Sequence, residues 1–130
     1  MPSEFEQTMI SELATFYREF GEPAQRTARG ESTATTLTAR VKRQQSEFKR
    51  KDERATEVLH KATLLVFSVV DATYGGVLAP VPGDTWKVAL TQGGALIDGW
   101  QAGAPAGKLG QWEIPVTYLE RIEVGGKRQS

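Results

Sequence analysis

The N-terminal twenty residues follow a helical hydrophobic pattern. Ser3 and Glu6 have the spacing of a capping box, in which each side chain satisfies the other residue's backbone N–H. The apolar stripe that follows consists of Phe5, Met9, Leu13, Phe16 and Phe20, widened by Ile10 and Tyr17. Gly21 comes where a left-handed C-cap is expected, and Pro23 prevents continuation. The pattern predicts a helix over about residues 4–20, whose stripe either packs on the core or docks in part on a neighbouring subunit.

Beyond Pro23 the hydrophobic period changes to the two-residue alternation of a β-strand. A short strand at about residues 24–28 and a turn at Gly30 and Glu31 precede a threonine-rich stretch over 33–42. One face of that stretch carries Thr33, Thr35, Leu37, Ala39 and Val41. Threonine density and alternation together predict a half-buried strand.

Another strand is expected over about residues 57–71. Its centre, residues 64–70, is apolar on both faces, so this strand should be covered on both sides of the sheet. Turn signals follow in dense succession and end in the Pro-Gly-Asp sequence of residues 82–84. Residues 85–90 then alternate as a short strand.

The last strand has the longest alternation in the chain. Apolar residues point one way over about residues 112–124, with Glu120 as the single exception and a bulge expected near Leu119 and Glu120. Residues 93–110, which precede this strand, are rich in glycine and predict a loop. Three apolar residues within that loop could form a short strand: Leu96, Ile97 and Trp100.

These elements predict a mainly β fold with an N-terminal α-helix. About five to six antiparallel strands would close as a small β-barrel or sandwich with long loops. The length of 130 residues fits one domain. The expected divisions are the helix at about 4–20, the barrel or sandwich at about 24–124, a charged loop at 42–56, the glycine-rich loop at 93–110 and a polar tail at 125–130.

The charged loop interrupts the alternation of strands. Its basic residues outnumber Glu47, Asp52 and Glu53, and Phe48 is its one large apolar residue. Such a stretch is typical of a solvated loop or a short exposed helix; the functional alternative is a protruding arm that contacts a partner or an anionic surface. The candidate contact residues are Lys42, Arg43, Lys49, Arg50, Lys51 and Arg54.

Composition narrows the chemistry that the chain could perform. Sixteen basic residues balance sixteen acidic ones, which argues against a globally basic nucleic-acid binder and removes the self-repulsion that opposes association. The chain has no cysteine, and its one histidine, His60, reads as an ordinary strand residue. No carboxylate pair or hydrolase motif has a recognisable spacing. We therefore predict no enzyme, catalytic residue, metal or cofactor. Neither a signal peptide nor a membrane-length apolar run is visible, so synthesis in a cytoplasm and no membrane partner are expected.

The order of elements resembles a known family. A short amphipathic helix ends in the Phe-Gly-Glu-Pro sequence of residues 20–23, and a threonine-rich strand pair with a glycine turn follows. A charged excursion, a strand, the Pro-Gly-Asp turn and a final strand with Trp112 complete the order. This arrangement resembles the small head–tail joining proteins of long-tailed bacteriophages, the head-completion or stopper class, which are similar to the lambda head–tail joining protein. The glycine-rich run at 93–110 is longer than the short hairpin common in that family.

The resemblance implies a structural virion protein of the phage neck, synthesised in the host cytoplasm. Such a protein would form a closed ring of about twelve copies, or about six, because repeated copies can match a portal only through head-to-tail contacts that close. Its partners would be further copies of itself, the portal or adaptor above, and the tail terminator or tail tube below. Non-specific contact with packaged DNA is also implied, with residues 42–56 as the loop that projects.

Two other functions stay open at the level of sequence. An oligonucleotide-binding barrel is favoured by the basic segment and by Trp86, Trp100 and Trp112 as stacking platforms for single-stranded nucleic acid. Core packing is the competing interpretation of the tryptophans, since Trp86 and Trp112 lie in register with apolar alternates. A small accessory or ligand-binding barrel, with the glycine-rich loop as a mobile lid, is the second alternative, although no residue names a ligand.

Overall fold

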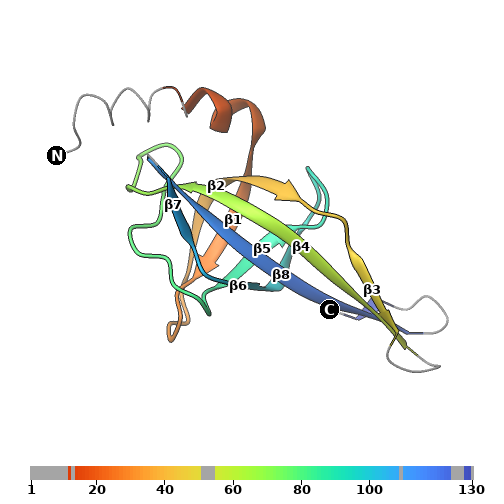
Figure 1. Ribbon diagram of the computed structural model, residues 1–130. Coiled ribbons are helices and arrows are strands. Elements are labelled where there is room, and N and C mark those ends of the chain that lie inside the picture. Colours follow the sequence, from red (N-terminus) through yellow and green to blue (C-terminus); the bar gives the residue numbers. More distant parts are fainter. Residues whose placement is uncertain (1–11, 13, 51–54, 109, 124–127, 130) are drawn as a thin grey trace.

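Six antiparallel strands close into a barrel in the computed structural model, which describes residues 12, 14–50, 55–108, 110–123 and 128–129 (Figure 1). A helix at residues 14–20 leads directly into the first strand. The strands are β1 (Gly21–Thr27), β2 (Ala34–Arg43), β3 (Glu47–Arg50), β4 (Ala55–Phe67), β5 (Thr85–Ala89), β6 (Leu96–Ala102), β7 (Ala106–Lys108), β8 (Gln111–Glu123) and β9 (Arg128–Gln129). The expected mainly β fold with a preceding helix is confirmed.

The barrel wall follows the order β4-β2-β1-β5-β6-β8, and pairing of β8 with β4 closes it. That closing pair is unbroken from Ala55↔Glu123 to Phe67↔Gln111. The bulge expected near Leu119 and Glu120 is therefore wrong, because both residues stay in register with β4. Three strands lie outside the closed wall: β3 pairs with β4, and β7 and β9 pair with β8.

Alternation along the strands fills the barrel interior. On β4 the inward residues include Leu64 and Val66, and on β8 they include Ile114 and Val116, all at most 1% exposed. Trp86 and Trp100, which face each other across β5 and β6, occupy the largest share of this core. The opposite face of β4 is also covered where Leu65 and Phe67 are buried, as the first part of the two-sided apolar run predicted. The rest of that prediction is wrong, because β4 ends at Phe67 and Val69 and Val70 are 37% and 69% exposed.

Two segments expected to be loops contain strands. Residues 42–56 include the end of β2, all of β3 and the start of β4, so the charged stretch extends the sheet instead of leaving it. Alternation is hidden here because both faces carry charge, and strand pairing supplies the order that the apolar pattern lacks. The glycine-rich stretch 93–110 contains β6 and β7, with β6 covering the predicted short strand around Trp100.

Gly21 does not cap the helix in the left-handed region as expected. Gly21 is not among the described glycines with positive φ, and it is the first residue of β1. A Cβ at this position would collide with the Tyr17 carbonyl oxygen and the Thr38 methyl group. Glycine is needed here because helix and strand pass too close for a side chain. Gly30, by contrast, has φ of 83° in the turn between β1 and β2.

A buried carboxylate, that of Asp84, connects two strands at one end of the barrel. Asp84, from the Pro-Gly-Asp turn, has a fully buried side chain and receives hydrogen bonds from Arg26 Nε at 2.9 Å and from the Arg29 and Val81 backbone N–H groups. Arg26 Nη2 lies 2.8 Å from the same carboxylate. The turn therefore ties the end of β1 to the start of β5.

We expect Asp84→Ala to lower the free energy of unfolding by about 3–5 kcal/mol, because it leaves the Arg26 guanidinium without its buried partner. Asp98→Ala is the matched control, since Asp98 is exposed and accepts a hydrogen bond from its neighbour Gly99; it should change stability by less than ~0.5 kcal/mol. Urea unfolding of the two variants measures the difference. Equal midpoints would contradict the assigned role of Asp84.

Candidate functional site

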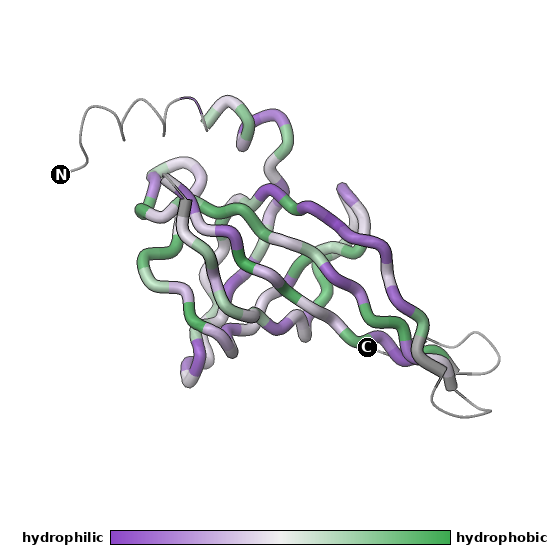
Figure 2. Tube along the Cα trace, in the orientation of Figure 1, coloured by the Kyte–Doolittle hydropathy of each residue, from purple (hydrophilic) through white to green (hydrophobic). Residues whose placement is uncertain are grey.

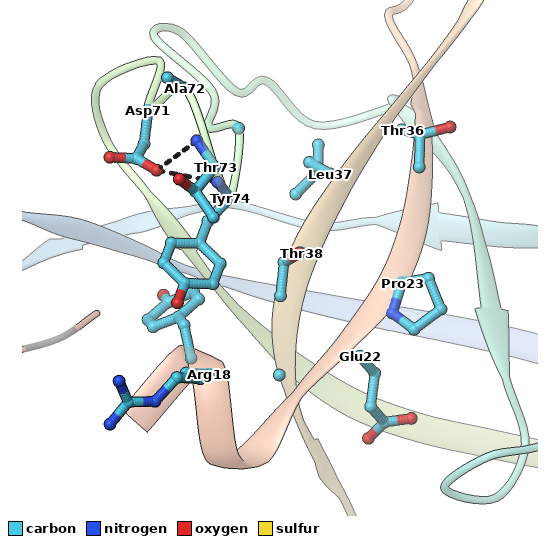
Figure 3. Close-up of a pocket in the computed structure, with 13 residues that line it drawn as sticks. Arg18, Glu22, Pro23, Thr36, Leu37, Thr38, Asp71, Ala72, Thr73 and Tyr74 are labelled. Carbon is cyan, nitrogen blue, oxygen red and sulfur yellow. Dashed lines mark hydrogen bonds between the residues drawn. The ribbon is translucent and has the colours of Figure 1, made fainter. Parts of the chain in front are cut away.

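An open cleft lies between the N-terminal helix, the β1–β2 hairpin and the loop after β4 (Figure 3). Its volume is about 750 Å³. The lining residues are Tyr17, Arg18, Gly21, Glu22, Pro23, Thr36, Leu37, Thr38, Asp71, Ala72, Thr73, Tyr74 and Gly75. The Asp71 carboxylate shapes the loop by accepting hydrogen bonds from the Thr73 and Tyr74 N–H groups, both at 2.8 Å. Tyr17 lines this cleft and contacts the barrel beyond it.

Tyr17 anchors the helix. Its ring stacks on Phe67 with centroids 4.4 Å apart and lies 6.0 Å from Tyr74, and its hydroxyl donates to Gln111 Oε1 at 3.1 Å. Burial raises the pKa of the Tyr17 hydroxyl well above its usual range, and the nearby Arg40 guanidinium opposes that rise only in part. Tyr17 is the one residue of the described helix that is buried.

The rest of the apolar stripe that can be placed faces solvent. Phe16 and Phe20 are 47% and 54% exposed, and their i, i+4 spacing puts them on one side of the helix. The Arg40 guanidinium lies 5.2 Å from the Phe16 ring centroid. Core packing is therefore the wrong interpretation for these two residues, while Phe5, Met9, Ile10 and Leu13 lie outside the described residues.

An arm projects from the barrel at the end away from the helix (Figure 1). We define it as β3, residues 55–61 of β4, residues 117–123 of β8, and β9. β2 pairs with β4 only from Ala62 inward along the barrel, so β3 replaces it as the neighbour of β4 in the arm. Two large apolar side chains of the arm face solvent: Phe48 is 77% exposed and Leu119 is 51% exposed.

The six basic residues expected to contact a partner do not form one group. Lys42 is exposed near the end of β2, where hydrophilic residues run toward β3 (Figure 2). Arg43 makes an intramolecular bidentate ion pair with Glu22, at 2.8 and 2.6 Å, and also donates to the Ala89 carbonyl at 3.0 Å. Lys49 and Arg50 belong to β3. Lys51 and Arg54 lie outside the described residues.

Arg43 therefore acts within the fold as a bridge from β2 to β1 and β5. Glu22, its partner, is 7% exposed although it follows directly after the helix junction. Sequence reasoning grouped Arg43 with the surface charges because its neighbours are polar. Its partner Glu22 lies 21 positions earlier in the chain, and no local pattern around Arg43 indicates that the two residues meet.

A polar chain of three residues sits at the base of the arm. The Ser46 hydroxyl lies 2.9 Å from His60 Nδ1, and His60 Nε2 lies 3.1 Å from Glu120 Oε1. The His60 ring also stacks on Tyr118, with centroids 5.8 Å apart. Hydrolase triads place the nucleophile at Nε2 and the carboxylate at Nδ1, and here these positions are exchanged. Within the described chain this arrangement fixes the start of β3 against β4 and β8.

Glu120 is the one exception in the apolar series of the last strand, and the structure shows why it is there. It occupies an inward position on β8 and is only 2% exposed, so the exception in the apolar series is a buried carboxylate and not a bulge. His60, which the sequence predicted to be an ordinary strand histidine, contacts this carboxylate through its Nε2 atom. A lone carboxylate in an inward register is a usable signal, because burial of a charge requires a partner.

The tryptophans do not form a stacking surface. Trp86 and Trp100 are buried in the barrel, with exposed fractions of 0% and 2%, and Trp100 Nε1 donates to the Val88 carbonyl. Trp112 is partly buried and donates to the Val77 carbonyl at 3.0 Å. Core packing, the competing interpretation of these residues, is the one that the burial supports.

Two further features bear on function, a metal-ligand cluster and a membrane-spanning helix, and the residues that the structure describes contain neither. None of their histidine, aspartate and glutamate side chains gather in threes at a spacing that would hold a metal ion. The helix that can be placed is also too short and too polar to span a bilayer. Comparison of the chain with protein-family models, curated proteins and solved structures gives no match.

We expect Tyr17→Phe to remove one hydrogen bond and lower stability by about 1 kcal/mol at neutral pH. At alkaline pH the difference in stability between the intact protein and the variant should become smaller. The unfolded chain ionises Tyr17 above its ordinary pKa of about 10, whereas the folded chain keeps the proton, so the intact protein loses up to ~1.4 kcal/mol of stability per pH unit from this residue. Denaturant unfolding from pH 8 to 11 should show a shrinking gap between the two proteins. A constant gap would contradict the buried hydroxyl.

Arg43→Ala should lower the free energy of unfolding by about 1.5–3 kcal/mol, because the Glu22 carboxylate loses charge-assisted hydrogen bonds in a largely buried position. Its neighbour gives a matched control: Lys42→Ala removes an exposed charge and should cost less than ~0.5 kcal/mol. Thermal and urea unfolding measure both. If the two variants unfolded at the same midpoint, Arg43 would be a surface charge after all.

Proposed function

We propose that this protein is a structural component of the phage neck, joining the portal or adaptor of the head to the tail and sealing the DNA channel as an oligomeric ring. The observation that carries the proposal is the exposure of large aromatic side chains at two separate ends of a small closed barrel. Phe16 and Phe20 lie on the helix, and Phe48 lies on the arm. Surface aromatics of this kind are typical of assembly interfaces.

The fold supports an assembly role in a second way. The barrel core contains no residue of the described helix and only Tyr118 from the arm, since its core cluster draws on β1, β2, β4, β5, β6 and β8 and on Val77 from the loop. The two appended elements therefore leave surface available for other chains. Their placement at opposite ends suits a subunit that must contact one neighbour on each side, as every subunit of a closed ring does.

The order of elements gives the proposal its particular form. A helix, a threonine-rich hairpin, a charged excursion and a Pro-Gly-Asp turn resemble the head–tail joining class, and the structure gives two of these motifs a physical purpose. Gly21 of the Phe-Gly-Glu-Pro junction permits the tight helix-to-strand passage. Asp84 of the turn is buried and pairs with Arg26 of β1, which ties the turn to the barrel. The tryptophan burial removes the main support for a barrel that binds single-stranded nucleic acid, so we propose no second function.

The position of the protein in an assembled particle tests this function. Cryo-EM or native mass spectrometry of particles that contain the chain should find about twelve copies, or about six, in a ring next to the portal. Genomic neighbours that encode a portal, a major capsid protein and a tail tube would agree with that position. One or two copies per particle, or no copies near the portal, would refute the proposal.

The sequence pattern predicts that Lys49, Arg50 and Lys51 are solvated surface charges, each of which contributes less than ~0.5 kcal/mol. Their combined neutralisation to glutamine should therefore leave folding stability nearly unchanged. Head–tail joining or retention of packaged DNA should fall instead. Lys87→Gln, on the barrel wall, is the control that should leave both unchanged. Yield of infectious particles, read beside the melting temperature, separates these effects. A triple variant that unfolds readily but joins normally once folded would assign the segment to the fold.

A further inference from the structure

The helix presents an apolar surface that its own barrel covers only in part, with the Arg40 guanidinium lying over the Phe16 ring. Tyr17 alone turns inward among the described helical residues, while Phe16 and Phe20 share the outward side. The sequence continues this stripe upstream at the same spacing through Leu13 and Met9. An amphipathic helix with its aromatic side outward is built to dock on a complementary apolar surface.

The arm presents the other apolar surface. Phe48 is the most exposed of the large apolar side chains described, at 77%, and it lies on β3, whose outer edge pairs with no other described strand. Phe48 aligns with Val58 on β4 and Glu120 on β8, so it continues the inward face of the barrel beyond the point where the barrel ends. An aromatic residue in this position extends the apolar interior into solvent, where another chain can cover it.

Charge distinguishes the two surfaces. Residues 3–20 contain four acidic residues and one basic residue, and Glu12 and Glu19 are exposed on the described helix. Residues 47–61 and 117–129, which span the arm in sequence, contain eight basic and six acidic residues. The helix side therefore carries a net negative charge and the arm side a small net positive charge. Opposite charge around two apolar patches favours contact between them and disfavours contact of either patch with its own kind.

The two surfaces cannot meet within one molecule, because the helix and the arm lie at opposite ends of the barrel (Figure 1). A second copy of the chain carries both surfaces, so each helix surface has one arm surface available on another copy. Repetition of such a contact is heterologous, joining unlike surfaces head to tail, and it generates a ring when the rotation closes.

We propose that the exposed Phe16–Phe20 side of the helix docks on the Phe48 arm of a second copy of this chain. The inference rests on the proposed function to the extent that a neck ring needs such a contact, and it names the surfaces that make it. The aromatic residues form the buried centre of the contact, and the acidic helix residues face the basic end of the arm at its rim.

Cross-linking tests this contact directly, because the chain has no cysteine of its own. The double variant Glu19→Cys with Glu47→Cys changes two exposed positions beside the contact and keeps all three aromatic residues; in the full chain at high concentration, it is treated with a thiol-specific bismaleimide. A head-to-tail contact gives a ladder of dimers, trimers and larger species on a denaturing gel, since each copy is linked on both sides. Each single variant should remain monomeric. The matched control pairs Glu19→Cys with Leu78→Cys, a position that is 68% exposed and outside the contact, and should give no ladder.

A third substitution separates docking from random collision. Phe16→Ser, added to the cross-linking pair, should reduce the ladder at least tenfold, whereas Val70→Ser, which changes a 69% exposed valine, should leave it intact. Three results would each overturn the inference: no product from the double variant, dimers from a single variant, or an equal ladder from the control pair. The proposed function fails separately. If the ladder forms but the chain is missing from a ring near the portal, the contact stands and the proposed function is refuted. If particles carry the ring but no link forms between positions 19 and 47, the function stands and the contact is refuted.

Discussion

The pairing of β4 with β8 is the constraint on which the rest of the structure depends. These two strands stay in register over thirteen residues each, farther than any other pair in the described chain. Their inner halves close the barrel, because β2 and β6 join them on either side only there. Their outer halves continue past the barrel and become the arm, with β3 and β9 as neighbours. One continuous ladder thus creates both the enclosed core and the projecting surface. A barrel closed by shorter strands would have the first and lack the second.

Three buried carboxylates hold the other strands in place around this ladder. Asp84 binds Arg26 across the β1–β5 end, Glu22 binds Arg43 between β1 and β2, and Glu120 contacts His60 at the base of the arm. Each pair joins residues at least twenty positions apart in sequence. Buried ion pairs add little net stability, but loss of one partner is costly. Their contribution here is to penalise any register in which the two partners fail to meet.

The interior and the appended elements divide the work of the molecule. Trp86, Trp100 and the inward aliphatic residues complete a core that requires no other chain. Helix and arm hold their apolar side chains outside it, where Tyr17 and the His60–Glu120 contact fix their positions. The surfaces that we propose for assembly are therefore largely separate from the residues that fill the barrel.

The sequence predicted those elements whose structure depends on residues close together in the chain. Two-residue alternation located the threonine-rich strand and the long last strand, and the two-sided apolar run located β4. The turn at Gly30 and the mainly β class followed from the same rules. Pattern misplaced the charged segment and the glycine-rich segment as loops, because in both the order comes from hydrogen bonds to β4, β5 and β8 and not from apolar alternation.

Only the tertiary structure decided which side of the helix is buried and what each charge does. An apolar stripe specifies that a helix has two sides, but the barrel surface offers space for one aromatic ring, and Tyr17 takes it by stacking on Phe67. Arg43 and Lys42 are neighbours with the same charge in sequence, yet one is bound to Glu22 and the other is exposed. Glu120 looked like a break in a strand and is its buried hydrogen-bonding group. In each case the deciding partner is remote along the chain, and folding is what brings it within a hydrogen bond or a ring contact.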